Sequence, residues 1–126
     1  MAEYTTTDAK NNMNDLVDGL KAQYDQLSSY MQTLPSLTQQ TEVNNLRSKL
    51  SLEIHHRELM AAFDEAAATV IRPPAQAEVD NLQNTLRDLN KSISAIADFQ
   101  AVVGFIENVM TETAQSFNDI VATIST

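Results

Sequence analysis

The sequence predicts an all-α fold, an antiparallel bundle of three or four long amphipathic helices with coiled-coil-like packing. The first observation is composition: the 126 residues include only 2 Gly and 3 Pro, whereas a β-rich domain of this size needs many tight turns built from such residues. The second is spacing, because apolar residues recur three and four positions apart over long stretches, as on one face of a helix. The length fits one domain, residues 1–126.

The first helix is expected over residues 7–33. Thr5 and Asp8 have the spacing of a capping box, in which each side chain accepts a hydrogen bond from the backbone of the other residue. Gly19 interrupts the helix and costs about 1 kcal/mol relative to alanine. Seven apolar residues at alternating spacings of four and three outweigh that cost: Met13, Val17, Leu20, Tyr24, Leu27, Met31 and Leu34.

The second helix is expected over residues 37–71. Pro35 ends the first helix, and Ser36 provides a cap for the next one. The apolar pattern slips in phase between Ile54 and Leu59, which indicates that the face turns toward a second neighbour. Its apolar residues are Val43, Leu46, Leu50, Ile54, Leu59, Met60, Phe63, Ala67 and Val70.

Residues 75–124, which follow the break at Pro73 and Pro74, have an apolar residue at every seventh position from Leu82 to Ile124. One helix of this length would extend for ~75 Å. The local sequence favours this continuous helix, whereas compactness favours a split near residues 100–104, because the first two helices cannot cover such a length. Both arrangements remain open at this stage.

The C-terminal half of this segment is apolar around roughly half of the helix circumference, so it needs more than one neighbour. In a compact monomer, the first two helices could supply both neighbours if the chain turns back near Gly104. We expect instead an intermolecular contact here, in a homo-oligomer, most simply a two-fold dimer, or with another helical protein. The candidate interface residues are Phe99, Val102, Val103, Phe105, Ile106, Val109, Met110 and Phe117.

Charge and composition limit the classes of partner that the protein is expected to bind. The net charge is −9, and the 8 Lys and Arg residues are not clustered, so no nucleic-acid binding is expected. A membrane-active protein remains an alternative, because the stretch from Ile93 to Met110 has only two charged residues, Asp98 and Glu107. Cysteine and a signal peptide are both missing from the sequence, which predicts a cytoplasmic location or export by a route without a cleavable signal peptide.

The sequence contains no recognisable catalytic motif, and no cofactor is expected. Glu53 and His56 have the Glu-x-x-His spacing of di-iron carboxylate bundles. The 2 histidines, His55 and His56, are adjacent, so a second motif could come only from the other subunit of a symmetric dimer. The sequence therefore predicts a non-enzymatic interaction or assembly protein, with a carboxylate and histidine metal-binding bundle as a further alternative.

Overall fold

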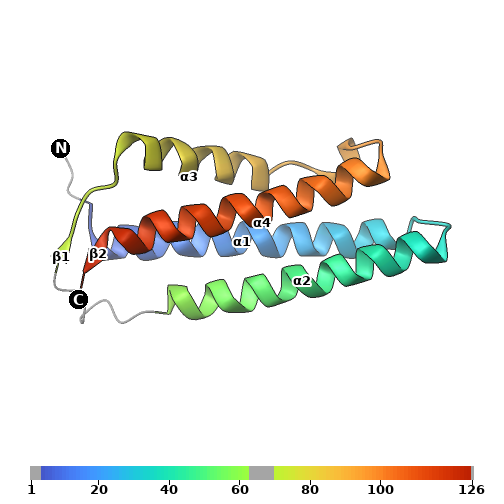
Figure 1. Cartoon of the computed structure of the whole chain (residues 1–126), viewed down its shortest axis with the longest axis horizontal. Helices are drawn as coiled ribbons and strands as arrows, with labels where there is room; N and C mark the ends of the chain where they lie inside the picture. The colour runs from blue at the N-terminus through green and yellow to red at the C-terminus, as the bar shows by residue number, and fades with distance from the viewer. Residues whose placement is uncertain (1–3, 63–69, 126) are drawn as a thin grey trace.

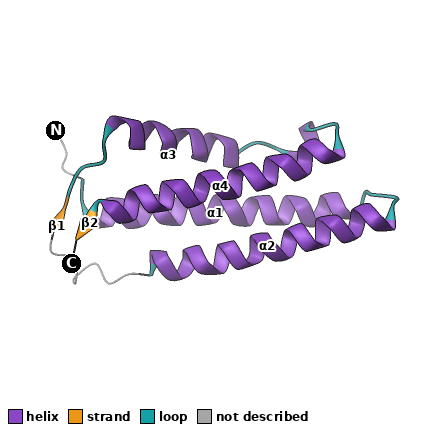
Figure 2. Ribbon diagram, viewed as in Figure 1, coloured by secondary structure: helices purple, strands orange, loops and turns teal. Residues whose placement is uncertain are grey.

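The computed structural model describes residues 4–62 and 70–125, and within them it confirms the all-α bundle (Figure 1). Four long helices run alternately in opposite directions, and loops and a short two-stranded ladder connect or flank them (Figure 2). The helices are α1 (Thr6–Met31), α2 (Leu37–Ala61), α3 (Gln76–Leu89) and α4 (Phe99–Ala122). The smaller elements are β1 (Val70–Ile71), the 3-10 turn η2 (Ile93–Ala95) and β2 (Ile124–Ser125).

Helix α1 begins at the predicted capping box. The Asp8 amide donates to Thr5 Oγ1 over 3.1 Å, and the Thr5 amide donates to Asp8 Oδ2 over 2.9 Å. Gly19 has a packing role in the middle of this helix, since a Cβ atom there would lie 2.9 Å from the Cβ of Leu89. The missing side chain therefore allows the end of α3 to approach α1 closely.

Helix α2 begins where predicted, with Ser36 Oγ accepting from the Gln39 amide over 3.3 Å. Its predicted end at residue 71 is wrong, because residues 70–71 form β1, which pairs antiparallel with β2. The backbone of Val70 and Ile71 thus pairs with that of Ser125 and Ile124, and the extended conformation of a strand suits β-branched residues such as valine and isoleucine. Residues 63–69 of the predicted helix lie outside the described part of the chain.

Neither of the two arrangements left open for segment 75–124 is correct in detail: the continuous helix is wrong, because the segment forms two helices, and they separate at residues 90–98, before the expected 100–104. Two glutamines of α1 hold the connection: Gln23 Nε2 donates to the carbonyls of Leu89 (2.8 Å) and Lys91 (2.9 Å), and Gln26 Oε1 accepts from the Ile93 amide (2.7 Å). Asp98 then caps α4 by accepting from the Ala101 amide. The connection thus depends on side chains far away in the sequence.

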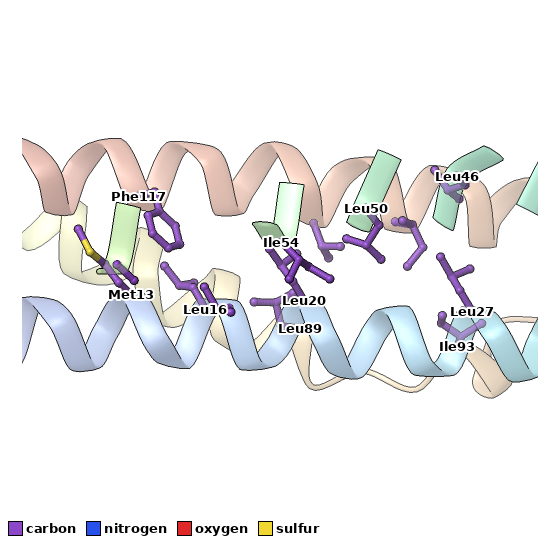
Figure 3. Packing of buried hydrophobic residues seen from close by; sticks show 14 of the residues in the cluster. Met13, Leu16, Leu20, Leu27, Leu46, Leu50, Ile54, Leu89, Ile93 and Phe117 are labelled. Atoms are coloured by element: carbon purple, nitrogen blue, oxygen red, sulfur yellow. The ribbon is translucent and has the colours of Figure 1, made fainter. Parts of the chain in front are cut away.

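Helices α1 and α4 each pack against the other three helices, while α2 and α3 lie on opposite sides of this central pair (Figure 1). The core is a continuous layer of aliphatic side chains with one ring, that of Phe117, between α1 and α4 (Figure 3). The coiled-coil-like character of this packing stays a prediction. Fully buried large side chains include Met13, Leu16, Leu20, Leu27, Leu50, Leu89, Ile93, Ile106 and Phe117.

Candidate interaction surface

The eight candidate interface residues of α4 fall into two groups. Val102, Ile106, Val109 and Phe117 are completely buried within the chain's own bundle. Phe99, Val103, Phe105 and Met110 pack against this core and are half-buried. Because the chain turns back at residues 90–98, before α4 begins, the other three helices cover much of the wide apolar arc of α4. Only the half-buried group is available to a partner while the bundle is closed.

Helix α2 is apolar on both sides. Its inner side contributes Val43, Leu46 and Leu50 to the core. Leu52 and Leu59 project from the opposite side, with 71% and 62% of their surface exposed. They are seven residues apart, so they lie one above the other on the helix. The phase slip predicted at Leu59 therefore moves this leucine out of the core and onto the surface.

An open groove of about 540 Å³ lies between α2 and α4, beside Leu52. Leu52, Met110 and Ala114 provide its apolar surface, and charged side chains of both signs border it, those of Lys49, Glu53 and Glu107. Val121, which is 43% exposed, follows Met110 by eleven residues and so lies on the same side of α4. We call the surface formed by Lys49, Leu52, Leu59, Glu107 and Met110 the α2–α4 face.

A buried arginine of α2, Arg57, contacts α4 next to the α2–α4 face. The Arg57 side chain lies with its guanidinium carbon 5.5 Å from the centre of the Phe117 ring, a cation–π arrangement. Its Nη2 donates to Glu53 Oε2 over 2.9 Å. The residue is only 8% exposed, so this pairing offsets part of the cost of burying its charge.

The same contact bears on the metal-binding alternative. Glu53, the carboxylate of the Glu-x-x-His motif, is bound to Arg57, and both His55 and His56 are exposed. Across residues 4–62 and 70–125, no three His, Asp or Glu side chains are grouped so that they could hold a metal ion. A site shared between two copies of the chain stays an untested prediction.

Charge is distributed unevenly over the helices. Helix α2 has no net charge, with Arg47, Lys49 and Arg57 balancing Glu42, Glu53 and Glu58. Helix α4 contains Glu107, Glu112 and Asp119 but no Lys or Arg. Helix α2 as a whole is thus neutral, in a protein whose net charge is −9.

The sequence did not single out Leu52, because only the apolar residues expected to face the core were assigned to the second helix. The signal that could have found it is the seven-residue spacing of Leu52 and Leu59, out of phase with the core leucines.

Within the described residues, no helix has the length and apolar character needed to cross a membrane. Comparisons of the chain with known protein families, curated proteins and solved structures give no significant match.

Proposed function

We propose that this protein is a non-enzymatic helical assembly protein that self-associates through the α2–α4 face. The observation that carries the proposal is the pair Leu52 and Leu59, two leucines that α2 holds in solvent on the side opposite the core. Burying a leucine side chain fully contributes about 1.5–3 kcal/mol. Two copies that bury this pair together with the half-buried Met110 would gain most of their association energy from these contacts.

Charge favours a second copy of the same chain as the occupant of this face. Most surfaces of a molecule with net charge −9 repel an identical molecule, but the α2–α4 face has a lysine on one edge and a glutamate on the other. In the described part of the chain, neither Lys49 nor Glu107 forms an ion pair. A two-fold axis would place Lys49 of one copy beside Glu107 of the other, twice in each dimer.

The direct test compares the molar mass of wild type and variants by light scattering after size exclusion. We expect the wild type to reach twice the 13.9 kDa of one chain as its concentration rises, and Leu52→Glu to remain a monomer with unchanged helix content. The matched control is Leu37→Glu, which changes an even more exposed leucine (77%) of the same helix roughly 22 Å away along its axis. A wild type that stays monomeric at high concentration would refute self-association.

A charge swap tests the arrangement of the two copies. Lys49→Glu and Glu107→Lys should each weaken the dimer, because each places like charges in contact. The double variant should recover much of the lost affinity, since it restores opposite charges at both contacts. Two single effects that merely add in the double variant would show that these residues do not meet across a two-fold axis.

A further inference from the structure

A hollow that shares no lining residue with the α2–α4 face lies between α3, the beginning of α1 and the end of α4. Its volume is about 350 Å³, at the small end of the range for small-molecule sites. Val79, Leu82 and Leu86 of α3 form one apolar wall, and Ile120 of α4 lies opposite. Helix α3 thus uses part of its apolar side to line a cavity, and only Thr85 and Leu89 of that helix are buried.

One polar atom at this cavity stands out. Asp119 Oδ1 accepts a hydrogen bond from Gln115 Nε2 over 2.9 Å, but Asp119 Oδ2 is buried and has no hydrogen-bond partner in the described part of the chain. An acceptor without a partner is costly where water cannot reach it, and the cost is greater when the acceptor is charged. The Asp119 carboxylate, which borders the cavity, therefore lacks one hydrogen bond, and a turn of its side chain that opens Oδ2 to the cavity would let a ligand donate to it.

The other carboxylate at the cavity is already neutralised. Arg72 donates to both oxygens of Glu78, over 2.9 and 3.2 Å, and the Ala75 amide donates to Glu78 Oε1 over 2.8 Å. The Tyr4 hydroxyl accepts from Asn12 Nδ2, and burial, more than any other effect, raises the pKa of this phenol, so it stays neutral. The described lining residues include no Lys or Arg. Arg72 also attracts the Asp119 carboxylate, but its single positive charge cannot balance both Glu78 and Asp119, so these three groups together keep a net negative charge.

We propose that this cavity binds a small organic cation, a primary amine attached to a short apolar body. The apolar body would lie against Leu82, Leu86 and Ile120, and the ammonium group would donate to Asp119. The same arrangement disfavours anions, because the net charge of Arg72, Glu78 and Asp119 is negative. It also favours the amine over a neutral alcohol of the same shape, since a charge-assisted hydrogen bond is the stronger one.

The test uses phenethylamine and its neutral counterpart 2-phenylethanol, with affinity measured by calorimetry and the site mapped by methyl NMR on the wild type. We expect saturable binding of the amine, methyl shifts confined to Val79, Leu82, Leu86 and Ile120, and much weaker binding of the alcohol. Asp119→Asn should lower the affinity for the amine roughly 10- to 100-fold, the effect of losing a hydrogen bond between two charged groups.

Asp80→Asn is the matched control. Asp80 accepts from Gln76 Nε2 over 2.9 Å, four residues earlier in its helix, just as Asp119 accepts from Gln115. Asp80, however, is exposed and is not among the residues that line the cavity, so this variant should bind the amine as the wild type does. Equal affinity for amine and alcohol, methyl shifts elsewhere, or no saturable binding at millimolar amine would each overturn the proposal. The wild-type measurements decide the matter even if Asp119→Asn does not fold.

Discussion

At the scale of single residues, the two glycines occupy helices for different reasons. A Cβ atom added at Gly19 would lie 2.8 Å from Leu89 Cδ1 and 2.9 Å from Leu89 Cβ, whereas one added at Gly104 would have no neighbour within 4 Å. Neither glycine has a positive φ angle, so alanine suits the backbone at both positions. The effect of an added methyl group therefore depends only on the space around it.

We predict opposite effects for the same substitution at these two positions. Gly104→Ala should raise the free energy of unfolding by about 0.5–1 kcal/mol, because alanine is the better helix former. Gly19→Ala should lower it by about 1–3 kcal/mol, because overpacking against Leu89 outweighs the same gain. Urea unfolding followed by circular dichroism measures both. A stabilising Gly19→Ala would mean that α1 and α3 are not in close contact there.

A second prediction concerns Glu112, which shares its surroundings with Asp88 of α3. Burial raises the pKa of the Glu112 carboxyl, and the neighbouring carboxylate of Asp88 raises it further. Lys91 holds the pKa of Asp88 below its ordinary value, through an ion pair of 3.0 Å. Since the folded state binds the Glu112 proton more tightly, this group favours folding at acidic pH, and its contribution is lost as the pH rises through its raised pKa.

Glu112→Gln should therefore raise the thermal midpoint at pH 7, by the equivalent of roughly 0.5 kcal/mol, since it removes one of two like charges. The gain should shrink as the pH falls through the raised pKa of Glu112 and vanish below the ordinary value of 4.5 for a glutamate, where wild-type Glu112 is protonated in both states. Thermal melts from pH 4 to pH 7 would measure this. Glu42→Gln, at an exposed position outside the α2–α4 face, is the control and should give little of this gain.

At the scale of elements, the connection between α3 and α4 depends on α1. The last carbonyls of a helix need partners outside it, and Gln23 supplies one for Leu89 and another for Lys91. Gln26, one turn further along α1, accepts from Ile93 at the start of η2. The place where the chain reverses is thus held by hydrogen bonds from a helix more than 60 residues earlier.

Gln23→Met tests this role, because methionine matches the shape of glutamine but cannot donate. We expect a loss of about 1–3 kcal/mol in the free energy of unfolding, the cost of leaving buried carbonyls without a donor. Hydrogen exchange at the amides of residues 89–93 should accelerate more than in α2. Gln100→Met, at an exposed position of α4, is the control and should change neither measurement. Unchanged exchange in Gln23→Met would show that Gln23 does not hold the connection between α3 and α4.

At the scale of the whole molecule, the four helices form a flattened arrangement in which α1 and α4 are central and α2 and α3 flank them. A central helix requires apolar residues on several sides, which accounts for the wide apolar arc of α4. A flanking helix requires only one apolar side, so the exposed leucines of α2 have no explanation within the fold. This contrast is the reason for assigning the proposed assembly surface to α2 and the adjoining edge of α4.

Ile106→Asp distinguishes core from interface within this arrangement. Ile106 has no exposed surface, so an aspartate there buries an unpaired charge and should cost several kcal/mol. We expect an unfolded or strongly destabilised chain by circular dichroism, unlike Leu52→Glu, which should stay helical. A folded monomer of Ile106→Asp would mean that α4 uses its central row to contact a partner and not the core.

The sequence alone was sufficient for the fold class, for both ends of α1 and for the start of α2, because these features depend on local periodicity, on caps such as Thr5 and Ser36, and on Pro35. It was not sufficient for the break between α3 and α4. The seven-residue repeat continues through Leu89 and Ile96 as if the helix did, and the interactions that end α3 come from Gln23 and Gln26.

Tertiary structure also decided which apolar residues are available to a partner. In the sequence, Ile106 and Leu52 are both apolar residues of a helix. Periodicity identifies an apolar helix face, but it does not show which neighbouring element covers that face. Only the packing of α4 among three neighbours buries Ile106, and only the position of α2 at the flank leaves Leu52 in solvent. The physical reason is that burial depends on the neighbours of a helix, which long-range contacts determine, whereas helix formation depends largely on residues within a few positions of one another.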